Sequence, residues 1–113
     1  NRDYIQFSEK YIKLIFYCIA MNLKIYRVKT EMEVQRRYID LLLIPKDMNS
    51  QYYSIIIEFK YLKKDEEDKL KETQMQAKEQ IEGYSKLEEI KALPKLNKYT
   101  VIAVNDKLYV EKI

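Results

Sequence analysis

The sequence lacks histidine entirely and contains a single cysteine, Cys18. Zinc sites built on imidazole, Ser/His/Asp or Cys/His catalysis, and an internal disulfide are therefore all excluded. One glycine and two prolines leave no glycine-rich loop for phosphates or dinucleotides. The chemistry of the protein must come from Asp, Glu, Lys, Arg, Tyr and Gln.

Long apolar runs are also missing. The longest uncharged one covers residues 14–21, far short of the roughly 18 residues that cross a bilayer. No secretory signal is recognisable, so we expect a cytoplasmic protein that does not contact membranes. With 113 residues, 47% of them apolar and 35% charged, residues 1–113 are expected to form a single folded domain. Because the chain begins at Asn1 rather than Met, we interpret it as a piece of a larger protein.

Hydrophobic periodicity predicts a helix, three strands, a second helix and two strands. The first helix follows Asp3 and ends near residues 21–23; the strands cover 24–34, 36–44 and 52–61; the second helix covers 66–90; the last strands cover 100–104 and 108–113. This order predicts the α/β class, with a central mixed β-sheet flanked by helices.

Charged residues interrupt the two most apolar strands. Asp40 stands between Ile39 and Leu41, and Glu58 and Lys60 follow three isoleucines. A buried charge is costly unless a counterion or a metal compensates it. If the two strands form a hairpin that turns near Asn49, residues whose numbers sum to 98 lie opposite each other, and Asp40 faces Glu58.

These side chains suit a divalent cation. Lys60, two residues after Glu58, points to the same face of its strand, and we expect its ammonium to lie between the two carboxylates. Oxygen ligands without histidine or cysteine favour Mg²⁺ or Mn²⁺. Such a cation, with Lys60 to position a water molecule, is typical of phosphoryl chemistry. The alternative is a charged cluster that only caps the strand edge.

The motif Ile39-Asp40, followed 18 residues later by Glu58-Phe59-Lys60, resembles the PD-(D/E)XK nuclease superfamily. That resemblance implies a restriction-endonuclease-like core and metal-dependent hydrolysis of phosphodiester bonds in DNA, although RNA is not excluded. More narrowly, residues 54–64 and 77–81 resemble the nuclease-like domain at the C-terminus of bacterial AAA-ATPase-like proteins. The chain would then be a C-terminal fragment with an N-terminal ATPase-like domain as a partner, and it could form oligomers.

The resemblance also assigns roles to individual residues. Asp40 and Glu58 would bind the metal together with Glu9, an acid in the first helix. Gln80 would assist Lys60 in catalysis, since Gln80 and Tyr84 reproduce the Gln-x-x-x-Tyr motif of RecB-type members on one helix face. The residues expected to contact nucleic acid are Arg37, which replaces a family glycine, Lys63, Lys64 and Tyr84.

Two functions follow from this interpretation. The first is a magnesium-dependent DNA nuclease with Asp40, Glu58, Lys60 and Gln80 as catalytic residues. The alternative is a catalytically silent domain of the same fold that serves as a regulatory or interaction module of an ATPase-like protein.

Overall fold

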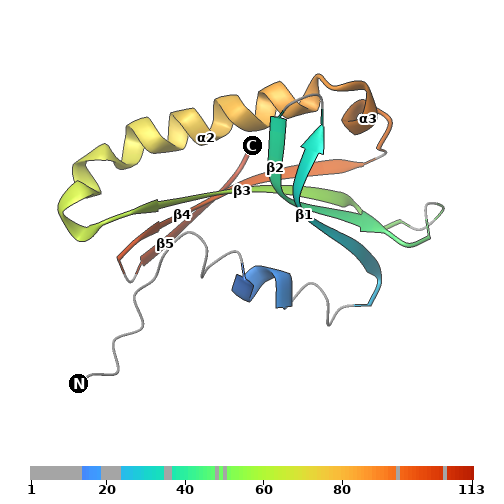
Figure 1. Ribbon diagram of the computed structural model, residues 1–113, viewed down its shortest axis with the longest axis horizontal. Helices are drawn as coiled ribbons and strands as arrows, with labels where there is room; N and C mark the ends of the chain where they lie inside the picture. The colour runs from blue at the N-terminus through green and yellow to red at the C-terminus, as the bar shows by residue number, and fades with distance from the viewer. Residues whose placement is uncertain are drawn as a thin grey trace.

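A five-stranded sheet forms the centre of the computed structural model, with the strands in the order β1-β2-β3-β4-β5 (Figure 1). The structure describes residues 14–18, 24–34, 37–47, 49, 51–93, 95–105 and 107–113. The strands are β1 (Tyr26–Val34), β2 (Arg37–Pro45), β3 (Ser54–Leu62), β4 (Leu96–Val104) and β5 (Lys107–Lys112). The predicted α/β class is confirmed.

Strands β2 and β3 form the predicted antiparallel hairpin. Their paired residues are Leu41 with Ile57, Leu42 with Ile56, and Leu43 with Ile55, so each pair sums to 98. The turn lies where the polar residues predicted it, and the backbone amide of Asn49 donates to Asp47 Oδ1 at 2.9 Å. The predicted register is therefore confirmed.

Strand β4 runs parallel to β3, whereas all other neighbouring strands are antiparallel. A parallel pair requires a long crossover connection. Here it comprises the 3₁₀ helix η1 (Lys64–Lys69) and the α-helices α2 (Leu70–Ser85) and α3 (Glu88–Lys91). Figure 1 shows α2 lying along one face of the sheet, and the helical residues 14–18 lying on the other.

The single helix predicted over 66–90 is wrong at both ends. Its first turns are 3₁₀, and α2 ends at Ser85 because Leu87 adopts an extended conformation with φ −73° and ψ 139°. This break redirects the chain so that Leu87 and Ile90 both join Tyr84 in the core. Burial of two more apolar side chains thus outweighs continuation of the helix.

Strand β4 begins at Leu96, earlier than the predicted 100–104, because its pairing with β3 continues through Ser54. Strand β2 ends at Pro45, which pairs with Tyr26, one residue beyond the predicted range 36–44. Of the predicted first helix, residues 14–18 are described and helical. No helix in the described ranges is long and apolar enough to cross a membrane.

Apolar residues fill both faces of the sheet. On one face, Phe59 packs among Leu41, Leu43 and Val101 and meets the ring of Phe16 at 5.2 Å. The other face packs against α2, whose buried residues are Thr73, Ala77, Ile81 and Tyr84. Their spacing of three and four residues presents one side of α2 to the sheet. Glu58 and Lys60 belong to this second face, since side chains alternate along β3.

Candidate active site

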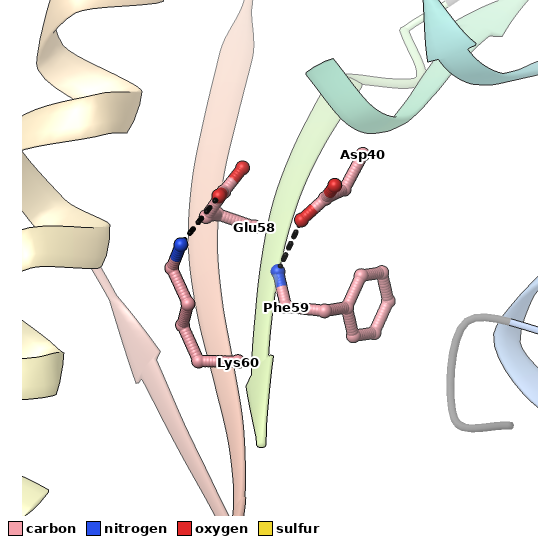
Figure 2. Close-up of polar contacts among 4 residues, drawn as sticks. All are labelled: Asp40, Glu58, Phe59 and Lys60. Atoms are coloured by element: carbon pink, nitrogen blue, oxygen red, sulfur yellow. Dashed lines mark hydrogen bonds and ion pairs between the residues drawn. The ribbon is translucent and has the colours of Figure 1, made fainter. Parts of the chain in front are cut away.

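Asp40 ends the ladder between β2 and β3. Beyond the pair Leu41–Ile57, the backbone amide of Phe59 donates to Asp40 Oδ2 at 2.9 Å instead of to a backbone carbonyl (Figure 2). A side-chain acceptor of this kind satisfies a buried amide as well as the ladder would. The two strands separate here, and the buried carboxyl group of Asp40 lies at the register position opposite Glu58.

The carboxylate of Glu58 is almost completely buried, with 3% of the residue exposed. Its Oε2 lies 3.5 Å from Nζ of Lys60. Its Oε1 is buried and has no hydrogen-bond partner among the described residues. A buried carboxylate oxygen without a donor is costly, so this atom is available to a ligand that supplies positive charge or a proton.

The pKa of Glu58 is raised from its ordinary value of 4.5 to about 8, first by burial and second by the negative charge of Asp40. The ammonium of Lys60 acts in the opposite direction and lowers this pKa. Because desolvation and a like charge both disfavour the ionised form, Glu58 holds a proton at neutral pH in the metal-free domain.

The position of Lys60 differs from the expected one. In Figure 2 the carboxylate of Glu58 lies between the ammonium of Lys60 and the carboxylate of Asp40, rather than the ammonium lying between the acids. The physical reason is that Asp40 reaches β3 from the neighbouring strand, whereas Lys60 extends along β3 toward α2. Lys60 remains partly exposed, with its charge at the entrance to the site.

Helix α2 brings Gln80 beside Lys60. The two residues line an open hollow of about 370 Å³ together with Gln76 and Glu79. Sequence reasoning missed Gln76 and Glu79 as site residues. The signal was present, because Gln76 precedes Gln80 by four residues and therefore shares its face of the helix.

Thr100 is a third residue that sequence reasoning missed. It pairs with Glu58 across the parallel strands β3 and β4 and is fully buried. Its hydroxyl has no hydrogen-bond partner within the described part of the chain. No local pattern reveals this, because Thr100 only precedes the apolar run of residues 101–104, and its neighbour Glu58 is distant in sequence.

The remaining predicted residues are not gathered at one place. Glu9 lies outside the described residues, and of Arg37 only the backbone, at the start of β2, is described. Lys63 and Lys64 are exposed beyond the end of β3. Tyr84 is 5% exposed and packs in the core beneath α2. This burial favours a role for Tyr84 in core packing over contact with nucleic acid.

The donor set fits a hard divalent cation. Two carboxylates converge from β2 and β3, and Glu58 Oε1 is buried without a partner among the described residues. No group of three His, Cys, Asp or Glu that could hold a metal ion occurs within those residues. Mg²⁺ is commonly held by one or two carboxylates, with water and substrate phosphate as the other ligands, so Asp40 and Glu58 are sufficient on the protein side.

The model of the PD-(D/E)XK nuclease superfamily matches residues 7–112. The match includes β2, β3 and α2, and hence Asp40, Glu58, Lys60 and Gln80. No curated protein and no solved structure matches the chain.

The raised pKa of Glu58 predicts a characteristic pH dependence of stability. Between about pH 4.5 and pH 8 the folded domain holds a proton that the unfolded chain has lost, so its free energy of unfolding should fall as the pH rises. The contribution of one proton approaches about 1.4 kcal/mol per pH unit. Glu58→Gln should remove this contribution and gain stability over wild type toward pH 8.

Urea denaturation of both metal-free proteins at several pH values measures this difference. Glu82→Gln, at an exposed position on α2, controls for the loss of an acidic side chain. Parallel stability curves for wild type and Glu58→Gln would contradict the assignment.

The unpaired hydroxyl of Thr100 generates a further prediction. Thr100→Val keeps the shape of the side chain and removes the buried hydroxyl, so it should raise the free energy of unfolding by about 1 kcal/mol. Thr100→Ser keeps the hydroxyl but removes the methyl group, and should lower it by a similar amount. If Thr100→Val is instead less stable than wild type in urea denaturation, the hydroxyl has a partner.

Proposed function

This chain belongs to the PD-(D/E)XK nuclease superfamily, and from that premise we propose that it is a metal-dependent nuclease that hydrolyses phosphodiester bonds in DNA. The observation that carries the proposal is the buried pair of Asp40 and Glu58 at the point where β2 and β3 separate, with Lys60 beside it. Burying two acids costs stability unless a cation compensates them, and a bound metal ion would supply that compensation.

The proposed metal ligands are Asp40 and Glu58, with Glu9 as an additional ligand. A divalent cation, when bound, supplies charge neutralisation at the phosphate and polarisation of the scissile bond. Glu58 must lose its proton before it can act as a ligand, and the nearby ammonium of Lys60 favours that loss.

Lys60 is the proposed catalytic cation. Its side chain opens into the hollow that Gln80 also lines, so its ammonium can reach a substrate phosphate there while it remains close to Glu58. In that position it would orient the attacking water and stabilise negative charge that develops on the phosphate. Gln80, from α2, would donate a hydrogen bond to the same phosphate or water, which is the role we propose for the Gln-x-x-x-Tyr segment.

The path of the nucleic acid is proposed from charge. Lys63 and Lys64 continue from β3, exposed and close in sequence to Lys60, and Arg37 opens the strand that carries Asp40. Such residues neutralise backbone phosphates without reading the bases. We further propose a cytoplasmic protein in which an ATPase-like domain accompanies this one.

The catalytically silent alternative predicts a different outcome in a simple assay. The nuclease should nick supercoiled plasmid in the presence of Mg²⁺ or Mn²⁺ and should stop when a chelator is added. A silent domain nicks at no metal concentration. RNA of comparable length, offered in the same assay, identifies the preferred nucleic acid.

Two substitutions at Asp40 should separate its two roles. Asp40→Asn removes the charge but keeps an oxygen that can accept from the Phe59 amide, so the fold should persist while affinity for Mn²⁺ is lost. Asp40→Ala also leaves that amide unsatisfied, and should cost a further 1–3 kcal/mol, roughly, in the free energy of unfolding. Calorimetric titration with Mn²⁺ and urea denaturation measure the two effects, and unchanged Mn²⁺ affinity in Asp40→Asn would refute the ligand assignment.

Lys60→Met should uncouple metal binding from cleavage. The apolar stem is kept, and a cation that competes with the metal is removed, so Mn²⁺ should bind at least as tightly. Plasmid nicking should fall roughly 100- to 1,000-fold, as when one preorganised electrostatic donor is removed elsewhere. Lys69→Met is the matched control, because Lys69 pairs with Glu66 on the surface away from the hollow. Nicking at the wild-type rate by Lys60→Met would refute this mechanism.

A further inference from the structure

Strand β5 forms one edge of the sheet and carries two exposed apolar side chains. Leu108 is 51% exposed and Val110 is 60% exposed. Their partners on β4, Ala103 and Val101, belong to the core on the face opposite α2, so both side chains extend that apolar face beyond its edge. A sheet edge of this kind is a template for pairing with another strand.

The backbone of β5 is oriented for such pairing. The amide of Ile113 donates to the carbonyl of Lys98 at 2.8 Å, in the same register as the rest of the β4–β5 ladder. Backbone groups alternate in direction along a strand, so Tyr109 also turns its amide and carbonyl toward β4. Leu108 and Val110 therefore turn theirs toward the side of β5 on which the described residues form no further strand.

We propose that β5 pairs in antiparallel fashion with β5 of a second copy of this chain, about a two-fold axis at Tyr109. In this register Leu108 lies opposite Val110 of the second copy, so the outward amides and carbonyls of these residues bond to each other. Lys107 lies opposite Glu111, and the symmetry repeats both pairs.

The charges of β5 select this register. A two-fold axis shifted to Val110 would place Leu108 opposite Lys112, and one shifted to Leu108 would place Lys107 opposite Tyr109. The axis at Tyr109 alone among these three places Lys107 against Glu111, which are opposite charges, and the two apolar residues against each other. Opposite charges and apolar pairs across neighbouring strands are both stabilising.

The side chains are also sorted correctly by face. Tyr109 packs toward α2, beside Ile102 and Leu70, and Glu111 lines a hollow against the same helix. A two-fold axis perpendicular to the sheet keeps the faces of both copies aligned. The result is one continuous sheet with both α2 helices on one side, and with the four side chains of Leu108 and Val110 covering each other on the other side.

Cysteine cross-linking tests the register directly. Tyr109 would form a pair without backbone bonds, in which Cα atoms approach to about 4.5 Å, within the range of a disulfide. In a Cys18→Ser background, Tyr109→Cys should therefore form a covalent dimer under mild oxidation. Lys107→Cys and Glu111→Cys should each cross-link poorly alone but efficiently when the two proteins are mixed.

Charge exchange provides an independent measurement by sedimentation equilibrium. Lys107→Glu creates two repulsive pairs per dimer and should raise the dissociation constant about tenfold or more. The double variant Lys107→Glu/Glu111→Lys should restore the wild-type value. Neither measurement depends on the nuclease proposal. A wild type that is monomeric at every concentration, or a Lys107→Cys and Glu111→Cys mixture that links no better than each alone, would overturn the pairing.

Discussion

The hydrogen bond from the Phe59 amide to Asp40 Oδ2 determines where β2 and β3 separate. It holds one carboxyl group inside the protein, opposite the buried Glu58. Two carboxylates that are close together and buried cannot both ionise without a compensating charge. Lys60 offsets only part of the free-energy cost of ionising Glu58. Burial of Glu58, together with the charge of Asp40 that this bond holds nearby, raises the pKa of Glu58 and creates the demand for a cation.

Much of the site could be predicted because the residues that define it are local. The apolar runs around Asp40 and Glu58 identify two buried strands, and the polar residues near Asn49 identify the turn, so the register follows from counting. The face shared by Glu58 and Lys60 follows from the alternation of side chains along a strand. The assignment of Gln80 came from the resemblance to the superfamily, and in the structure the crossover between the parallel strands β3 and β4 carries α2 back over this face of the sheet.

Other features depended on contacts between distant segments. The helix that follows β3 breaks at Leu87, and the break lets Leu87 and Ile90 enter the core. Helix propensities do not contain this information, because it depends on the space beneath the helix. Tyr84 lies in that same core, although its motif also fits a contact with nucleic acid. The burial of the Thr100 hydroxyl depends on the pairing of β4 with β3, which also places Thr100 beside Glu58. The order of the three charges was also beyond sequence reasoning, since it depends on the direction from which each side chain enters.

The ladder between β2 and β3 has a mechanical consequence. Three residue pairs join these strands in the described part of the chain, whereas nine join β3 to β4. The β1–β2 hairpin is thus attached to the rest of the sheet along a short seam, and the two acids stand on opposite sides of its open end. A ligand that binds both carboxylates would link β2 to β3 beyond the last of these residue pairs. Part of the binding energy of such a ligand would go into holding the β1–β2 hairpin against β3, so we expect binding at the site to make the sheet more rigid.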